Sequence, residues 1–246
     1  MGHKILKMKD KFGSLKKKKK DIFDMPFRAL IVGKSELSGK SNLIGNLLLR
    51  EEFYKNDFDG DDIFIVCPSS NLDEKFKVMI EEKEIPECNV FYEFDEEILE
   101  LIYNNLIEEF NEMVREGIKP SQKLLILDDC AVSLKDKQKG VLNKIMMNGR
   151  HILLNVLMTS QKYSLFDTVQ RENATGLMVF SCSDKQLQLI GEDHNIMKNK
   201  KQFRTTFRKT TEEPFSFMVI NYSNPKKNRY MDTEFNPINL EEDSSK

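Results

Sequence analysis

Residues 28–44 read Arg-Ala-Leu-Ile-Val-Gly-Lys-Ser-Glu-Leu-Ser-Gly-Lys-Ser-Asn-Leu-Ile, and this stretch decides the fold class of the chain. Its apolar beginning predicts a short strand at 27–33. Leucine and isoleucine then recur at helical spacing between 41 and about 50, which predicts a helix. A strand, a glycine-containing loop that ends in Gly39-Lys40-Ser41 and a helix together form the arrangement in which many proteins hold phosphate groups.

Each residue of this loop has an expected role if the phosphates belong to ATP. Loop amides and the positive end of the helix would face the phosphates, Lys40 would reach the β- and γ-phosphates, and the Ser41 hydroxyl would bind Mg²⁺. Lys40 is therefore predicted to be catalytic as well as nucleotide-binding. The full set of predicted nucleotide-binding residues is Gly33, Ser38, Gly39, Lys40, Ser41 and Asn42.

The loop departs from the usual spacing by one residue. The pattern for such loops is G-x-x-x-x-G-K-[ST]. Five positions before Gly39 stands Lys34, and Gly33 is one position further away, as if Glu36 and Leu37 replaced a single glycine. Two alternatives stay open from the sequence: an ordinary strand-to-helix turn, and a degenerate loop that no longer binds ATP well.

An acidic pair follows a second apolar strand. Residues 123–129 read Lys-Leu-Leu-Ile-Leu-Asp-Asp, so the strand carries Asp128 and Asp129 at its carboxyl end, where parallel sheets bind ligands. We expect Asp128 to hold Mg²⁺ and Asp129 to act as the general base that polarises the attacking water. A strand that ends in aspartate is common, so the pair gains its meaning from the Gly-Lys-Ser loop upstream.

Further polar residues flank a strand predicted at 153–159. Gln161 follows this strand, where its amide could sense the γ-phosphate or orient the attacking water. Arg150 precedes the strand and is predicted to be catalytic as an arginine finger inserted into a neighbouring subunit's site, with Arg171 as the second choice. Taken singly, Gln161 could be an exposed loop residue and Arg150 the partner in a surface salt bridge.

The rest of the chain alternates between strand-like and helix-like stretches. Short, continuously apolar strands separated by helices are typical of a mostly parallel sheet covered on both faces, so we predict an α/β fold. A late aromatic strand at 215–222 reads as half of a hairpin at the sheet edge. Further strands are predicted at 62–67, 89–92, 123–129 and 176–181, and further helices at 96–116 and 135–148.

Charge divides the chain unevenly. Residues 1–20 hold nine lysines and one aspartate, whereas the whole chain carries a net charge of −2. We therefore predict a basic arm at 1–22, an ATPase domain at 23–240 and an acidic tail at 241–246. The arm could bind nucleic acid or an anionic surface, direct nuclear import, or be a solvated tail without a role. No apolar run approaches the ~18 residues of a membrane span.

The four cysteines and three histidines are scattered along the sequence. No C-x-x-C pair is present, so buried free thiols are expected rather than a zinc site. Residues 198–209 carry six basic side chains, with Phe203 and Phe207 between them. This stretch could line a pore and grip a nucleic-acid backbone without reading its sequence, or it could be a solvated edge element.

Together these motifs resemble a known family, the viral genome-packaging ATPases of the FtsK/HerA group, specifically the poxvirus-type enzyme of nucleocytoplasmic large DNA viruses and virophages. The matching stretches are 28–44, Ile126-Leu-Asp-Asp, and above all Gly-Arg-His-Ile-Leu-Leu-Asn-Val-Leu-Met-Thr-Ser-Gln-Lys-Tyr at 149–163, followed by Arg171-Glu-Asn173. The resemblance covers roughly residues 26–240. Its block from Gly149 to Gln161 separates this group from generic P-loop proteins.

The resemblance implies a fold, an activity and a set of partners. The fold would be a RecA/FtsK-like ASCE P-loop NTPase with a C-terminal β-hairpin at the sheet edge. A homo-oligomeric ring, usually a pentamer or hexamer, would hydrolyse ATP with Mg²⁺ and pump double-stranded DNA into a preformed capsid, independently of DNA sequence. Capsid proteins would be further partners, and the site of action would be the cytoplasm or nucleus of the host cell, at the virus factory, or the virion.

The resemblance also assigns roles residue by residue. Lys40 and Ser41 carry over as nucleotide ligands, Asp128 as the Mg²⁺ acid, Asp129 as the base and Gln161 as the sensor. The arginine finger carries over less directly, with Arg150 ahead of Arg171, and the one-residue departure of the loop bears on nucleotide affinity.

Other functions fit the sequence less well. A nucleotide kinase should carry an acceptor-site arginine set and a lid, and an AAA-type ATPase a C-terminal helical domain. A transporter-type ATPase should carry a signature loop before the acidic strand. A non-enzymatic alternative stays open: a DNA-binding or capsid-assembly scaffold with weak or no hydrolysis. ATP turnover with and without DNA separates that class from a motor.

Overall fold

The structure, a computed structural model, describes residues 22–34, 38–68, 74–130 and 140–240. The predicted arm therefore lies outside the described residues except for Ile22, and so does the whole predicted tail at 241–246. The first five residues of the helix predicted at 135–148 are also outside them.

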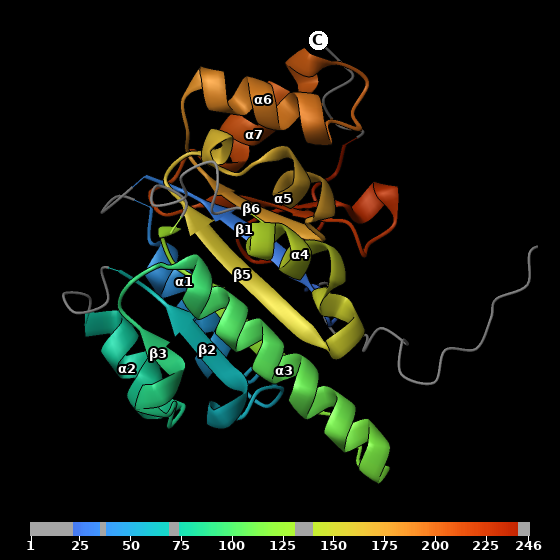
Figure 1. Cartoon of the computed structure of the whole chain (residues 1–246). Coiled ribbons are helices and arrows are strands. Elements are labelled where there is room, and N and C mark those ends of the chain that lie inside the picture. Colours follow the sequence, from blue (N-terminus) through green and yellow to red (C-terminus); the bar gives the residue numbers. More distant parts are fainter. Residues whose placement is uncertain (1–21, 35–37, 69–73, 131–139, 241–246) are drawn as a thin grey trace, which may run out of the picture.

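Within the described residues, eight strands form one sheet in the order β3-β2-β4-β5-β1-β6-β7-β8. The first six strands in this order are parallel, and β7 and β8 complete the edge in antiparallel pairing, as the predicted hairpin requires (Figure 1). The strands are β1 Arg28–Val32, β2 Ile63–Val66, β3 Val90–Phe91, β4 Lys123–Leu127, β5 Leu154–Ser160, β6 Gly176–Phe180, β7 Phe217–Asn221 and β8 Tyr230–Met231.

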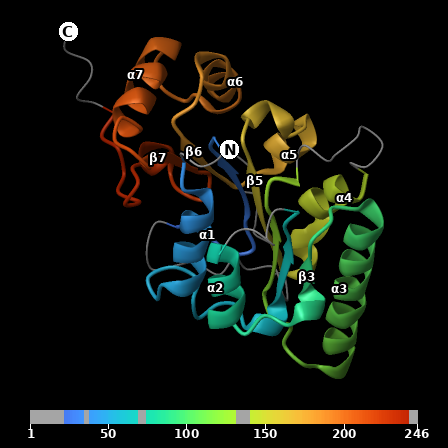
Figure 2. The ribbon, with the colours of Figure 1, turned by 90° about the vertical axis from the view of Figure 1, so that its left-hand side faces the viewer.

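Helices cover both faces of this sheet. Figure 2 shows α1 and α2 on one side of the strands and α3 and α4 on the other. The helices are α1 Lys40–Leu49, α2 Glu74–Glu82, α3 Glu96–Glu116, α4 Gly140–Asn148, α5 Thr168–Asn173, α6 Asp184–His194 and α7 Lys200–Thr210. Within the described residues, none of them is long and apolar enough to cross a membrane.

Alternation along the buried strands divides the core into two layers. Leu30 and Val32 of β1 face the cluster that includes the apolar sides of α3, α4, α6 and α7. Their neighbours Ala29 and Ile31 face the cluster that includes α1, α2 and the segment before β1. Because both faces are covered, these strands read as continuous apolar runs, which is the pattern that predicted the parallel sheet.

Every predicted strand is present, usually one or two residues shorter at each end. The predicted order of strands and helices in the chain is confirmed, and so is the α/β fold class. Four helices were not predicted: α2, α5, α6 and α7. Their apolar positions are few, and polar residues dominate α7, so periodicity gave only a weak signal there.

The basic stretch at 198–209 is mostly helix α7, and its aromatic residues are not available to a ligand. Phe203 and Phe207 are buried in the core, with exposed fractions of 1% and 2%. The basic side chains lie on the opposite, exposed side of the helix. Arg208 pairs with Asp184 at 2.7 Å. The two phenylalanines therefore pack α7 against the core and do not line a pore, while the basic side chains of the helix face outward.

Candidate functional site

The loop between β1 and α1 is shaped by two glycines that cannot be replaced without strain. Gly39 has a φ of 80° and forms the N-cap of α1 in the left-handed conformation, which glycine adopts most easily. A Cβ on Gly33 would lie 2.5 Å from the Cβ of Ser38 and 2.9 Å from Cδ2 of Phe180. Because Ser38 approaches so closely, position 33 has no room for a side chain, even though the loop is one residue longer than the usual pattern.

Lys40 points back across this loop. Its Nζ donates a 3.0 Å hydrogen bond to the carbonyl of Gly33, and it lies 3.4 Å from Oδ2 of Asp129. Only 7% of the Lys40 side chain is exposed. A buried ammonium group held by one carbonyl and one carboxylate, at the start of a helix, is placed to bind an anion.

The acidic pair is organised by Thr159, at the penultimate position of β5. Its hydroxyl donates a 2.7 Å hydrogen bond to Oδ1 of Asp128 and accepts a 2.9 Å bond from the backbone amide of Asp129. The Cys67 thiol donates to the other Asp128 oxygen at 3.4 Å. Burial raises the pKa of Asp128; the Thr159 hydrogen bond opposes this shift and the neighbouring Asp129 charge adds to it.

Asp129 has an unusual backbone and an unused oxygen. Its φ is 49°, a strained value for a residue with a side chain, and it turns the carboxylate toward Lys40. The buried Oδ1 of Asp129 has no hydrogen-bond partner within the described residues. An oriented carboxylate with a spare buried lone pair can accept a proton from water or bind a hydrated cation.

These residues fit a magnesium ion held in part by its nucleotide. No group of three or more His, Cys, Asp or Glu side chains in the described part of the chain could hold a metal ion alone. Mg²⁺ needs no such group, because it binds through one or two carboxylates, waters and substrate phosphates. Asp128, with Asp129 beside it, and Ser41 in the first turn of α1 supply oxygen ligands of that kind.

Gln161 follows β5 directly and is exposed. Pairing between β1 and β5 sets Val32 opposite Ser160, and the amide of Gly33 donates a 3.0 Å bond to the Ser160 carbonyl. Gln161 therefore lies beside the start of the loop between β1 and α1. The structure brings the predicted loop residues, the acidic pair and Gln161 together at the carboxyl ends of β1, β4 and β5.

Arg150 lies at the opposite end of the parallel strands, before the amino end of β5. It belongs to the turn of 3-10 helix Gly149–Ile152 that precedes β5, and its side chain is exposed. The pKa of Arg28, at the amino end of β1, is lowered by burial and then by the nearby charge of Arg150. The five residues of β1, at roughly 3.3 Å each, separate this end of the strands from the loop of the same chain.

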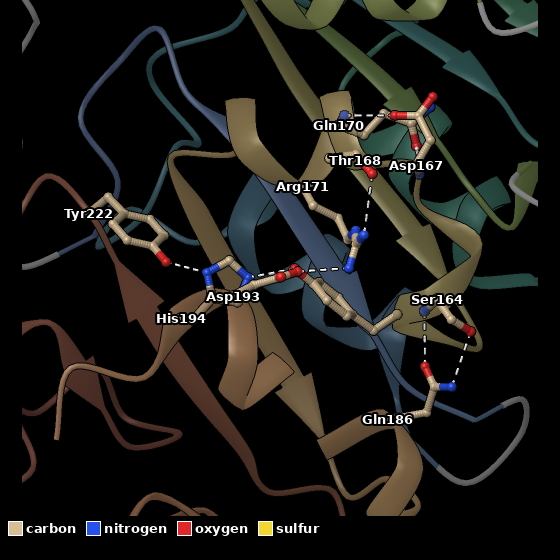
Figure 3. A network of polar contacts seen from close by, with 10 residues as sticks. Ser164, Asp167, Thr168, Gln170, Arg171, Gln186, Asp193, His194 and Tyr222 are labelled. Atoms are coloured by element: carbon tan, nitrogen blue, oxygen red, sulfur yellow. Dashed lines mark hydrogen bonds and ion pairs between the residues drawn. The ribbon is translucent and has the colours of Figure 1, made fainter. Parts of the chain in front are cut away.

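The second arginine, Arg171, is held inside its own chain. One guanidinium nitrogen donates a 2.7 Å bond to Oδ2 of Asp193, and the guanidinium lies 5.4 Å from the centre of the Tyr163 ring. Figure 3 shows Arg171 of α5 reaching Asp193 of α6. The Nε of Arg171 is buried and has no partner among the described residues.

A polar network continues from this ion pair to the edge of the sheet (Figure 3). The Tyr163 hydroxyl donates to Asp193 at 2.8 Å and lies 2.6 Å from Nε2 of His194, whose Nδ1 contacts the Tyr222 hydroxyl. Since Tyr163 has one proton, His194 carries its own on Nε2 and accepts from Tyr222. The backbone two residues beyond Gln161 is thereby fixed to α6 and to the end of β7.

Sequence reasoning missed Thr159 and this network. Local pattern assigns Thr159 no role, because its contact with the acidic pair depends on β5 lying next to β4. His194 and Tyr222 are 28 residues apart and carry no motif. Of the cysteines expected to be buried, Cys67 and Cys130 are buried, Cys182 is half-buried, and Cys88 is exposed, so the expectation is wrong for Cys88.

The fold and the site define a P-loop nucleoside triphosphatase of the FtsK-like class. The chain belongs to the family described as Poxvirus A32 protein, whose model matches residues 14–224. A comparison with curated proteins gives no match.

Solved structures of low sequence identity share this fold. The crystal structure of B204, the DNA-packaging ATPase from Sulfolobus turreted icosahedral virus, has a TM-score of 0.60 at 15% identity and covers 87% of this chain and 98% of its own. B204 from Sulfolobus turreted icosahedral virus 2 in complex with ATP-gammaS has a TM-score of 0.57 at 15% identity, with coverages of 83% and 95%. The pCW3 conjugation coupling protein TcpA with ATPgS has a TM-score of 0.55 at 12% identity, with coverages of 79% and 57%.

Proposed function

We propose that the chain is an ATP-driven motor that translocates double-stranded viral DNA into a preformed capsid in the infected host cell, at a virus factory in its cytoplasm or nucleus. The observation that carries the ATPase part is the contact of Lys40 with Asp129 across the loop between β1 and α1. This contact joins the phosphate-binding lysine to the acid proposed as general base. Membership of the Poxvirus A32 protein family and the B204 fold support the packaging part.

Each residue of the site has a proposed task. Lys40 leaves the Gly33 carbonyl and binds the β- and γ-phosphates, together with the amides of Gly39 and the first turn of α1 through Asn42. Asp128 and Ser41 would hold Mg²⁺, which would supply positive charge against the phosphates. Asp129 accepts the proton of the attacking water, and Gln161 orients that water against the γ-phosphate.

The position of Arg150 supports a ring. A finger residue must stabilise charge at the γ-phosphate, and Arg150 is separated from the loop of its own chain by the length of β1. It is exposed, so it can reach the site of an adjacent subunit. Arg171, by contrast, is committed to Asp193 within its own chain.

The exposed side of α7 supports a role in holding DNA. Lys201, Arg204 and Lys209 are exposed there, beside Arg208 with its partner Asp184. Lysine and arginine side chains bind phosphates without reading sequence, and such binding weakens steeply with salt. Capsid proteins are the proposed second partner, by the same family membership.

ATP hydrolysis by purified protein tests the proposal, with and without double-stranded DNA. We expect DNA-stimulated turnover in the wild type and its loss in Lys40→Ala and Asp129→Asn. ATP binding should be lost in the first variant and retained in the second. Lys144→Ala, an exposed lysine on α4, is the control and should behave as the wild type. A wild type that neither binds nor hydrolyses ATP would overturn the motor and favour a scaffold.

A further inference from the structure

The order of strands fixes the direction in which a bound nucleotide must lie. Strands β4 and β5, which carry the acidic pair and Gln161, lie on one side of β1, and β6 and β7 lie on the other. In the proposed function, on which this inference rests, hydrolysis takes place on the β4 and β5 side. The γ-phosphate is then on that side, and the nucleoside end of the molecule must leave the loop toward β6 and β7.

A pocket lies at this place. Its volume is about 260 Å³, and Lys34 and Ser38 of the phosphate-binding loop form one wall. Phe180 and Ser181 at the carboxyl end of β6 form the floor, and residues 211–216, which join α7 to β7, form the far wall. The volume is below the range of ~300–1,000 Å³ for whole drug-sized ligands, so it suits part of a nucleotide.

The far wall carries an aromatic residue in a position that normally belongs to glycine. The amide of Ser216 donates a 3.1 Å bond to the carbonyl of Glu213, which closes a turn with Pro214 second and Phe215 third. Phe215 has a φ of 64°. Turns with proline second and positive φ third usually hold glycine or asparagine there, because a side chain in this conformation is strained.

The ring of Phe215 is exposed and lies against the phosphate-binding loop. Its exposed fraction is 62%, a large value for phenylalanine. A Cβ placed on Gly39 would lie 3.5 Å from Cδ1 of Phe215, so the ring stands in van der Waals reach of the loop. The Ser216 hydroxyl also donates to Glu213 at 2.6 Å, which holds the turn in place.

We propose that this pocket binds the base of the nucleoside triphosphate and that Phe215 stacks on a purine ring. A flat, exposed aromatic beside the phosphate site offers a π-face to any base, and stacking of this kind does not depend on the edge of the base. The exposed carboxylates of Glu212 and Glu213 can accept from the amino group of adenine or from guanine. ATP and GTP should therefore bind with similar affinity, and pyrimidine triphosphates more weakly.

A tryptophan substitution gives a direct test, because the chain contains no tryptophan. In Phe215→Trp, ATP should quench the fluorescence, whereas inorganic tripolyphosphate, which lacks a base, should leave it nearly unchanged. Leu101→Trp, at a site 57% exposed on α3, which covers the sheet face opposite to α1, is the matched control and should respond to neither. Equal responses of Phe215→Trp to both compounds, or none to ATP, would overturn the stacking.

Calorimetric affinities separate this inference from the proposed function. Phe215→Ala should weaken ATP binding by about 5- to 100-fold and leave tripolyphosphate binding unchanged, while Phe215→Tyr should stay near the wild type. Lys40→Ala should weaken both compounds. Wild-type affinity for ATP in Phe215→Ala, alongside a loss in Lys40→Ala, would overturn the base pocket alone. A wild type that binds neither compound would overturn the proposed function together with the pocket.

Discussion

The Thr159 hydroxyl links the two acids of the site, with Oγ1 2.7 Å from Oδ1 of Asp128 and 2.9 Å from the amide nitrogen of Asp129. Thr159 is 1% exposed, and Asp128 is 4% exposed. One side chain on β5 thus fixes both the carboxylate proposed for Mg²⁺ and the strained backbone of the proposed base. The acids are therefore oriented by the neighbouring strand as well as by their own.

Thr159→Val should lower ATP turnover by about 10-fold or more, because both acids lose the partner that orients them. The free energy of unfolding should fall by about 1–3 kcal/mol, since a buried carboxylate and a partly buried amide lose a hydrogen bond. Steady-state kinetics at varied Mg²⁺ and urea unfolding measure the two effects. Thr159→Ser keeps the hydroxyl and should retain most of the turnover and most of the stability. Wild-type turnover in the valine variant would show that the contact is dispensable.

Gly39→Ala should lower ATP affinity and, because its φ is 80°, also lower stability by about 1–2 kcal/mol. Gly117→Ala is the matched control, with a φ of 74° and no described atom within 4 Å of the added Cβ. It should lose similar stability while ATP binding stays unchanged. Calorimetry and thermal unfolding of both variants measure this difference, and equal losses of affinity would argue against a special role for the loop.

Arg150→Ala and Arg171→Ala should fail in different ways. Arg150 is exposed, so its loss should change stability by less than about 0.5 kcal/mol and still lower turnover steeply. When the Arg150→Ala chain is mixed with a hydrolysis-deficient Asp129→Asn chain, the mixture should recover some activity, because each chain then supplies the residue that the other lacks. Arg171→Ala should destabilise by about 1–3 kcal/mol, since Asp193 loses its positively charged partner. No recovery on mixing would contradict a finger that acts between subunits.

Stability should fall between pH 6.5 and pH 4 because of His194. Burial lowers the pKa of His194 from 6.5 to about 4, although the Asp193 charge opposes the shift and Arg171 adds to it. In this window the unfolded chain binds the proton and the folded chain does not, so the free energy of unfolding decreases as pH falls. The free energy of unfolding that is lost across this pH window amounts to about 3 kcal/mol at most.

Urea unfolding at pH 7 and pH 4.5 measures this effect. His194→Gln should reduce the pH dependence, because the amide does not titrate, while Tyr163 and Tyr222 keep a polar neighbour. His151→Gln, at an exposed histidine, should leave the pH dependence as it is. An unchanged slope in His194→Gln would show that other groups carry the transition.

Much of the site could be predicted because its residues are close in sequence. Local sequence pattern alone predicts the loop from Gly33 to Ser41 and the strand that Asp128 follows. Helices α2 and α5 to α7 could not be predicted in the same way, since their buried positions are few and their folding depends on tertiary packing. Phe215 was read as part of a strand, whereas it forms the third position of a turn before β7.

The sequence by itself determined the class of fold, the phosphate loop and the acidic pair, because strand hydrophobicity, glycine conformation and loop chemistry act over a few residues. The tertiary structure alone decided which side of the loop faces Gln161 and which faces Phe215, since strand order is set by packing between distant segments. It also decided that Thr159 meets Asp128 and that Arg150 and Arg171 lie in different surroundings. These relations join residues tens of positions apart, and no local pattern encodes them.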